Sequence, residues 1–225
     1  VGEPTSGRVW LGHRGALSLR LTVRGRGAHG ILQHEGVNAF EGMLRVAREF
    51  QALKAEVEVR ETRLPIEPAQ ARRSILMLGG ECSSGHTFNT VPAVACFSLD
   101  RRTNPEEDFA AEKARLLDLC ARLRAEGVDL EEEILQEAEP TLADAGCDLA
   151  RALAEAVAEV TGQPPALTLC PGLLETRFYA RRGMPALAYG PGLLEVAHSP
   201  REYVDTGEVT AAAAVYAVVA ARLLG

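Results

Sequence analysis

The pattern of apolar and polar residues predicts four strands in the first 140 residues. Residues 16–24 (ALSLRLTVR) alternate with a period of two, which is typical of a strand with one buried face. Residues 74–78 and 94–99 are β-like runs on either side of a stretch rich in Gly, Ser, Asn and Pro, so they predict two strands joined by a long turn. Residues 133–138 alternate again and predict a fourth strand.

Two helices separate these strands. Asn38 can cap a helix over residues 39–53, in which apolar residues recur every three or four positions. The segment Asn104-Pro105-Glu106-Glu107 predicts a second helix start, with proline at the first position and acids in the first turn, and this helix is expected to continue to residue 125. The resulting order, β-α-β-β-α-β, predicts four antiparallel strands covered on one face by two helices.

The remaining residues follow a different pattern, and the expected fold class is α/β combined with α+β. We expect helices over residues 148–161, 176–182 and 208–224, and short apolar strands over 166–170 and 186–189. Short apolar strands that alternate with helices are typical of a parallel sheet buried on both faces. Because two or three strands make a thin sheet, the sheet is expected to continue in sequence upstream of Val1. The pattern predicts one domain, residues 15–140, inserted between residues 1–14 and 141–225 of another.

Composition and charge exclude several classes of protein. The 225 residues are 47% hydrophobic and 24% charged, which are the proportions of a globular protein. Lys and Arg number 24 against 31 Asp and Glu, a net charge of −7, and no basic stripe is present, so nucleic acid is not an expected partner. The longest apolar runs, such as residues 211–221, are too short and too rich in Ala to cross a bilayer, so no membrane partner is expected either.

The cysteines and the first residues bear on cellular location. The five cysteines are widely spaced and form no C-x-x-C pair, so neither a disulfide framework nor a zinc knuckle is expected, and a reducing compartment, the cytoplasm, fits best. The first residues contain no basic leader and no apolar signal core, so no targeting peptide is expected.

Two histidines stand in loops where they can carry chemistry. His198, in Ala-His-Ser-Pro, follows a predicted strand, and its imidazole can ligate zinc or play a purely structural part. His29 lies near glycines 27 and 30 at the end of the first strand, where it can donate a hydrogen bond to an anion or form an ordinary polar loop tip.

Other polar residues are ambiguous when taken singly. Asn89, in Asn-Thr-Val-Pro, fits a plain hairpin turn as well as a binding role. Arg102 and Arg177 can each hold a carboxylate through two parallel hydrogen bonds, but surface arginines are common. Glu3 is a lone acid close to a terminus.

The order of these segments is more specific than any one of them. In chain order they are Gly-Glu-Pro-Thr (2–5), Arg-Gly (14–15), Gly-Ala-His (27–29), Asn-Thr-Val-Pro (89–92), Leu-Asp-Arg-Arg (99–102), Thr-Arg-Phe-Tyr (176–179), Gly-Pro-Gly (190–192) and Ala-His-Ser-Pro-Arg-Glu-Tyr-Val (197–204). Over the whole chain this order resembles the M20 family of metallohydrolases, which includes acetylornithine deacetylase, succinyl-diaminopimelate desuccinylase, aminoacylase and a carboxypeptidase. The resemblance implies an incomplete zinc-hydrolase α/β catalytic domain with an inserted ferredoxin-like dimerisation domain, and therefore a homodimer.

The resemblance also implies roles for individual residues. Glu3 and His198 match metal ligands, one on each of two zinc ions, with cobalt or manganese as alternatives. His29 matches a histidine that reaches the active site of the partner subunit and stabilises the oxyanion. Asn89, Arg102 and Arg177 match residues that bind the carboxylate or amide region of the substrate.

The reaction that the resemblance implies is hydrolysis of the amide bond of a small N-acyl amino acid or peptide bearing a carboxylate, by water activated between two metal ions. In the family, the remaining ligands, a His of an H-x-D segment, a bridging Asp and a Glu beside the general-base Glu, precede Gly-Glu-Pro-Thr. The chain is therefore expected to be the C-terminal portion of such an enzyme and to be inactive alone.

Two other functions remain open. A non-catalytic dimerisation or binding module would keep the inserted domain and take up no metal. A serine hydrolase would use Ser199 with His198, but adjacent residues point in different directions and the chain has no G-x-S-x-G segment.

Overall fold

The computed structural model describes residues 1–225 and divides into two compact units. The first unit comprises Val1–Arg14, Thr62–Arg72 and Pro140–Gly225, and the second comprises Gly15–Glu61 and Arg73–Glu139. Residues 62–72, which the sequence analysis includes in the domain 15–140, make their contacts in the first unit.

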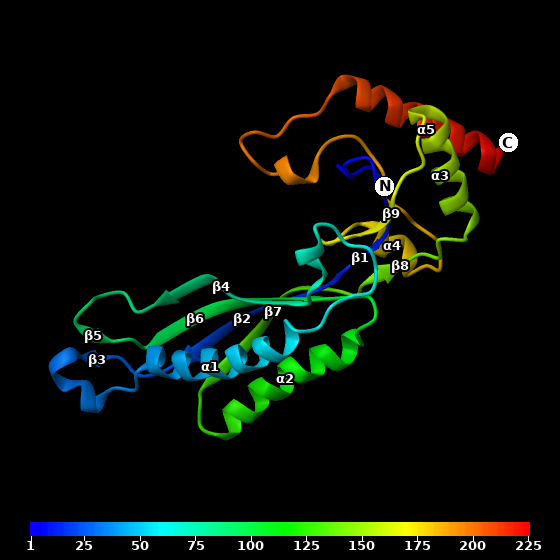
Figure 1. The fold of residues 1–225 in the computed structure, drawn as a ribbon. Coiled ribbons are helices and arrows are strands. Elements are labelled where there is room, and N and C mark those ends of the chain that lie inside the picture. Colours follow the sequence, from blue (N-terminus) through cyan, green and yellow to red (C-terminus); the bar gives the residue numbers. More distant parts are fainter. The chain divides into compact units, whose positions relative to one another are not determined.

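The second unit is an antiparallel sheet with two helices. Its strands lie in the order β4-β6-β2-β7, every neighbouring pair is antiparallel, and the two helices lie on the same face of the sheet (Figure 1). The predicted β-α-β-β-α-β order with a ferredoxin-like sheet is confirmed. Its elements are β2 (Gly15–Arg24), α1 (Ala39–Val57), β4 (Ile75–Ser84), β6 (Val94–Thr103), α2 (Phe109–Ala125) and β7 (Leu130–Ala138).

The period-two pattern of β2 is the basis of the core of this unit. Alternate residues of β2 are buried, and their side chains pack against apolar residues of both helices. The principal members of this core are Leu17, Leu19, Leu21 and Val23 of β2, Met43, Val46, Phe50 and Leu53 of α1, and Leu116, Cys120 and Leu123 of α2.

The two helices begin with side-chain caps. Asn38 caps α1 as predicted, since its Oδ1 accepts a hydrogen bond from Phe40 N at 3.0 Å. The predicted start of the second helix at Asn104-Pro105 is wrong, because α2 begins at Phe109 and is capped by Asp108. Glu107, one of the two acids that suggested the earlier start, instead accepts hydrogen bonds from Asn104 N and from Arg101.

A small two-stranded sheet lies beyond the main one. It pairs β3 (Ala28–His29) with β5 (Thr90–Val91), and the 3-10 helix η1 (Gly30–Glu35) follows β3. This sheet carries His29 and lies next to Asn89.

The first unit contains a three-stranded sheet in the order β8-β1-β9. Strand β1 is parallel to β9 and antiparallel to β8. The predicted helix 148–161 is confirmed, and the predicted strand 166–170 is confirmed over Leu167–Cys170. The predicted strand 186–189 is wrong, because this segment forms only an isolated bridge between Ala188 and Trp10. The elements are β1 (Val9–His13), η2 (Ala69–Arg72), β8 (Thr141–Leu142), α3 (Asp148–Thr161), β9 (Leu167–Cys170), α4 (Thr176–Ala180), η3 (Leu194–Val196) and α5 (Thr206–Leu224).

Helix α5 is longer than the apolar run from which the sequence analysis excluded a membrane span. It has 19 residues with a mean hydropathy of 1.5, which is long and apolar enough to cross a membrane by length and composition alone. In the structure α5 packs against α3, and Ala212 and Val215 are buried in the apolar cluster that the two helices share.

Candidate active site

Glu3 lies on a segment that runs beside residues 187–190. The amino group of Val1 donates a hydrogen bond to the carbonyl oxygen of Leu187 at 2.8 Å, which starts this pairing. The backbones approach so closely at Gly190 that a Cβ there would lie 2.6 Å from the Glu3 carbonyl oxygen. A glycine is therefore needed at position 190 to hold Glu3 where it is.

The Glu3 carboxyl group lies among other charged groups. Burial raises its pKa above the usual glutamate value, and the neighbouring carboxylate of Glu175 raises it further. The Val1 amino group and His198 act in the opposite direction. Glu175 and His198 are therefore each within electrostatic reach of the Glu3 carboxyl group.

His198 stands in a tight turn after η3. Its φ of 59° is in the left-handed region, and its backbone N donates to Oε2 of Glu202 at 2.9 Å. The neighbouring Ser199 hydroxyl donates to the carbonyl oxygen of Val196 at 2.7 Å. Because the Ser199 proton is engaged with the backbone and not with an imidazole, the geometry disfavours a serine nucleophile activated by His198.

Arg177 is held in place by its own helix. Its Nη1 donates to the carbonyl oxygen of Leu174 at 2.9 Å and lies 3.4 Å from Oε1 of Glu175. The guanidinium carbon lies 4.4 Å from the ring centre of Phe178, within cation–π range. These contacts leave other N–H groups of the guanidinium to bind a carboxylate.

The described residues contain no group of three or more His, Cys, Asp or Glu side chains that could hold a metal ion. Glu3 and His198 offer an oxygen and a nitrogen donor of the kinds that zinc accepts, but a zinc site takes three or four protein donors. These two residues therefore fit a contribution to a metal site and do not form a complete one. Their role as metal ligands stays a prediction.

In the second unit, the structure brings His29 and Asn89 together. The carbonyl oxygen of Asn89 accepts a hydrogen bond from Gly30 N at 2.7 Å, which joins the two loops. The Nδ1 atom of His29 accepts from Ile31 N at 3.3 Å, so in the neutral ring the proton is on Nε2. His29 is exposed, and its Nε2–H can donate a hydrogen bond to an oxygen atom.

Arg102 lies at the other end of the same unit. It is near the end of β6, opposite Ala16, whereas β6 starts at Val94 beside the β3–β5 end. Arg102 is eight positions after Val94 along the strand, a distance of about 26 Å. Within one copy of this unit, Arg102 and Asn89 therefore do not share a binding site. The Arg102 Nε donates instead to Oδ2 of Asp100 at 2.7 Å.

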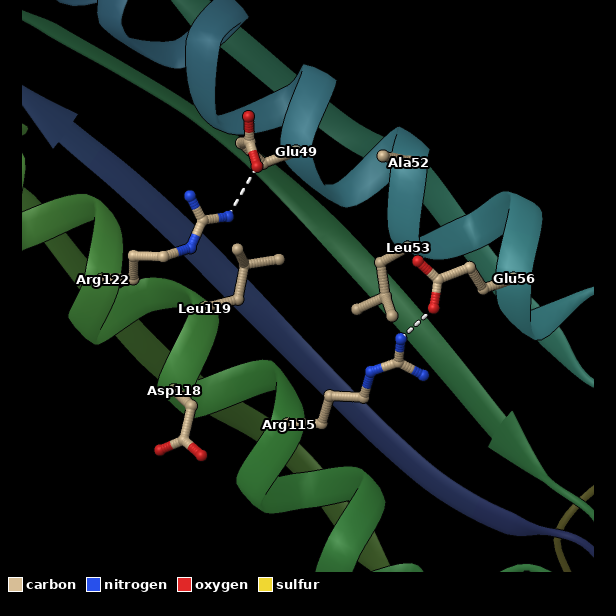
Figure 2. Close-up of a pocket in the computed structure, with 8 residues that line it drawn as sticks. All are labelled: Glu49, Ala52, Leu53, Glu56, Arg115, Asp118, Leu119 and Arg122. Atoms are coloured by element: carbon tan, nitrogen blue, oxygen red, sulfur yellow. Dashed lines mark hydrogen bonds and ion pairs between the residues drawn. The ribbon is translucent and has the colours of Figure 1, made fainter.

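A groove of about 340 Å³ lies between α1 and α2, and no predicted site residue lines it. Figure 2 shows acids of α1 facing arginines of α2 across it, and Arg122 Nη2 lies 2.6 Å from Glu49 Oε2. Arg115 and Glu56 form a second pair. Because these charges neutralise one another, the groove is a helix–helix contact rather than a candidate active site.

Sequence reasoning overlooked two residues of the first unit. Glu175 had no assigned role, yet its charge acts on Glu3. His13 stands directly before the Arg-Gly pair of the recognised order, and it is fully buried. The available signal was their position in the motifs: Glu175 lies two residues before Arg177, and His13 directly precedes Arg14.

A family model matches part of the chain. The peptidase dimerisation domain named M20_dimer matches residues 11–128. Among curated relatives, the succinyl-diaminopimelate desuccinylase of Alkalilimnicola ehrlichii is 30% identical over 230 residues, which cover all of this chain and 58% of the relative. A Mycobacterium tuberculosis protein with the same enzyme name is 28% identical over 212 residues, 94% of this chain and 54% of the relative. The chain thus spans little more than half the length of these relatives.

Solved structures share the fold at lower identity. An M20 family metallo-carboxypeptidase from Sulfolobus solfataricus superposes with a TM-score of 0.74 at 16% identity, covering 97% of this chain and 61% of the other. A tripeptidase from Staphylococcus aureus gives a TM-score of 0.70 at 15% identity, covering 95% of this chain and 52% of the other. Both comparisons agree with a chain that contains both units of this architecture.

Proposed function

Because the chain belongs to the M20 peptidase family and carries its peptidase dimerisation domain over residues 11–128, we propose that it is part of a metal-dependent amidohydrolase. The proposed reaction is hydrolysis of the amide bond of a small N-acyl amino acid, of the deacetylase or desuccinylase type, or of a small peptide. The relatives named as desuccinylases support the hydrolase class, and the substrate is part of the proposal.

The family match carries this proposal, and one observation of the structure supports it: the Glu3 carboxyl group lies within electrostatic reach of Glu175 and of His198. Burial and the Glu175 charge make an isolated Glu3 carboxylate unfavourable, and a cation would remove this penalty. In the proposed site Glu3 and His198 contribute ligands to zinc, with other ligands supplied from outside these 225 residues. Zinc, when bound, supplies a water molecule of lowered pKa as the nucleophile.

The other predicted residues act on the substrate. His29 donates a hydrogen bond from Nε2–H to the carbonyl oxygen as negative charge develops there, and its exposed position lets it act in the partner subunit of a homodimer. Asn89 binds the amide region near His29. Arg177 in the first unit and Arg102 in the second unit each bind the carboxylate or amide region of a substrate, and Arg102 does not share that site with Asn89 of the same copy.

The test uses the full-length parent protein. We expect it to hydrolyse one or more members of a panel of succinyl-diaminopimelate, N-acetyl amino acids and short peptides, to lose activity with a chelator and to regain it with zinc or cobalt. His198→Ala is expected to lower the bound zinc. Full activity after exhaustive chelation would reject the proposal.

His29 has a matched control in the same loop. His29→Ala is expected to lower kcat by about 10² to 10³, the usual cost of losing one oxyanion donor. His34→Ala removes an imidazole whose side chain is 72% exposed, and this variant is expected to retain activity. Equal losses in the two variants would assign the effect to the loop and not to an oxyanion donor.

A second candidate function is a dimerisation module without catalysis in this chain. It is favoured by the lack of a group of three metal-binding side chains in the described residues. Under this function the chain forms a dimer and takes up no zinc. Light scattering and calorimetric zinc titration of the chain and of the parent protein separate the two functions, because a hydrolase parent binds stoichiometric zinc.

A cytoplasmic location is also part of the proposal. All five cysteines are free, in agreement with a reducing compartment.

A further inference from the structure

His13 is a buried imidazole with one unsatisfied nitrogen. The residue is 0% exposed, and its Nδ1 lies 2.7 Å from the carbonyl oxygen of Arg14. A carbonyl oxygen only accepts, so Nδ1 carries the proton and Nε2 is left with a lone pair. No group of the protein donates to this buried Nε2 atom. Buried polar atoms of this kind nearly always have a partner, either protein or ordered water.

Two threonine hydroxyl groups on neighbouring elements are also buried without a hydrogen-bond partner. Thr141 of β8 lies directly opposite His13 in the antiparallel β1–β8 pair, which places the two side chains on the same face. The Thr141 Oγ1 atom is buried and has no hydrogen-bond partner. Thr176, the first residue of α4, is 1% exposed, and its Oγ1 atom is also unpartnered.

Two observations place Thr176 in the same part of the first unit as His13. Helix α4 packs against β8, the strand that carries Thr141. The residues on both sides of Thr176, Glu175 and Arg177, are also close enough for their charges to act on the His13 ring. Three unsatisfied polar atoms from β1, β8 and α4 thus belong to one buried region of the first unit.

We propose that His13 Nε2, Thr141 Oγ1 and Thr176 Oγ1 together bind one buried water molecule. Water supplies what the three atoms need: it donates one proton to Nε2 and one to a threonine oxygen, and it accepts the hydroxyl proton of the other threonine. The lone pair of Nε2 requires a donor, and neither threonine meets this need directly. The described residues include no metal-binding group of three side chains, which favours water over a metal ion at this place.

This water would fix the start of α4 relative to the sheet. Thr176 directly precedes Arg177, so the three residues become positioning residues for the guanidinium that is proposed to bind the substrate carboxylate. This consequence rests on the proposed function, whereas the water site itself does not.

The water site is tested first without an activity assay, on the full-length protein. A high-resolution crystal structure is expected to show one water within hydrogen-bonding distance of all three atoms. The ¹⁵N spectrum of the His13 ring, assigned with His13→Gln, is expected to show a protonated Nδ1 and a hydrogen-bonded, unprotonated Nε2. The proposal would be overturned by any of three results: a direct hydrogen bond between His13 and a threonine, a metal ion at this place, or an Nε2 atom without a hydrogen bond.

Conservative variants test whether the two hydroxyls share one ligand. Thr141→Val and Thr176→Val are each expected to shift the Nε2 signal toward that of a free nitrogen and to lower the melting temperature. Because each removes the same water, the double variant should lose no more than the larger single loss, and full additivity would overturn the proposal. Thr168→Val is the matched control, since its hydroxyl on β9 is also buried and unpartnered but Thr168 pairs with Trp10 rather than with His13, and it should leave the His13 signal unchanged.

Kinetics then test the positioning role. Thr176→Val is expected to raise KM for a carboxylate substrate about fivefold with kcat unchanged, the effect of one lost hydrogen bond on binding. If Thr176→Val shows the expected ¹⁵N shift but an unchanged KM, the water site stands and the positioning role is rejected. A parent protein without hydrolase activity, but with the water in place, would reject the proposed function alone.

Discussion

Arg101 and Glu107 form a buried ion pair in the second unit. Arg101 Nη2 lies 2.6 Å from Glu107 Oε1, and the Arg101 side chain is only 1% exposed. The same guanidinium also lies 2.8 Å from Oε2 of Glu112, and Arg60 contacts both acids from the other side. One fully buried cation is therefore shared between two acids that precede and begin α2.

Removing the shared cation is expected to destabilise the protein strongly. Arg101→Met should lower the free energy of unfolding by about 3–5 kcal/mol, because it leaves two largely buried carboxylates without their central partner. Arg24→Met removes an arginine from an exposed pair with Glu131 and is the matched control, for which only a small change is expected. Chemical denaturation of both variants measures the difference. Equally small losses of stability in both variants would show that solvent compensates for the removal of Arg101.

The two acids also make stability depend on pH. Burial alone would raise the pKa of Glu107, but hydrogen bonds from Ser74 and Asn104 N and the charge of Arg101 outweigh it, so its pKa is lowered. The pKa of Glu112 is lowered in the same way by Arg60 and Arg101 against burial.

A glutamate with a lowered folded pKa stabilises the protein above its unfolded pKa of about 4.3, and this contribution is lost as pH falls from there through the folded value. Glu107→Gln should therefore be less stable than wild type at pH 7 and should lose less further stability below about pH 4.3. Ser74→Ala removes one of the hydrogen bonds and should give an intermediate slope. Urea titrations at several pH values supply the comparison, and parallel curves for wild type and Glu107→Gln would contradict the expected linkage.

The elements that the sequence could predict are those in which periodicity reports one-sided burial. Strand β2 alternates because one face meets α1 and α2, and helix α3 shows its apolar stripe for the same reason. Strand β1 was not predicted, because four of its five residues are buried and a strand covered on both faces does not alternate. Residues 62–72 gave no signal of their contacts in the first unit, since long-range packing leaves no local pattern.

The residues of the candidate site also divide into those that the sequence could predict and those that it could not. Motif order could select Glu3 and His198, which share one electrostatic environment, and His29 and Asn89, which share one end of the second unit. The sequence could not reveal that Arg102 lies about 26 Å along β6 from that end, because the direction and length of a strand are set by its pairing. Nor could it reveal that the charge of Glu175 acts on Glu3, because the two residues are far apart in the chain.

His13 should give the protein a second pH dependence. Burial lowers its pKa below the usual value, with Arg177 acting in the same direction and the hydrogen bond to the Arg14 carbonyl opposing it. In the unfolded chain His13 binds a proton below about pH 6.5, so between that pH and the lower folded pKa unfolding takes up protons.

Stability should consequently fall as pH drops below about 6.5, with a slope of up to about 1.4 kcal/mol per pH unit from this residue. His13→Gln should lack this part of the slope. A variant with His13 intact and the exposed His34 replaced by Gln serves as the matched control and should retain it. Denaturation midpoints measured from pH 7 to pH 5 decide the matter, and an unchanged slope in His13→Gln would show that His13 is not neutral in the folded protein.

Gly190 offers a steric test of the Glu3 segment. A Cβ at this position would lie 2.6 Å from the Glu3 carbonyl oxygen and 2.9 Å from Glu3 N, closer than real contacts allow, so Gly190→Ala must displace the segment. Overpacking of this kind costs about 1–3 kcal/mol, and we expect a lower melting temperature. At Gly172 the added Cβ would meet only the Cys170 sulfur at 3.7 Å, an ordinary contact, so Gly172→Ala is the matched control and should be close to wild type.

The same pair of variants tests Glu3 as a metal ligand in the full-length protein. If Glu3 binds zinc, its displacement in Gly190→Ala should weaken zinc binding in calorimetric titrations, because ligand geometry sets metal affinity, whereas Gly172→Ala should bind zinc as wild type does. The steric clash does not depend on metal, so the lower melting temperature is expected in either case. A destabilised Gly190→Ala with wild-type zinc affinity would therefore remove Glu3 from the metal site while leaving the packing argument intact.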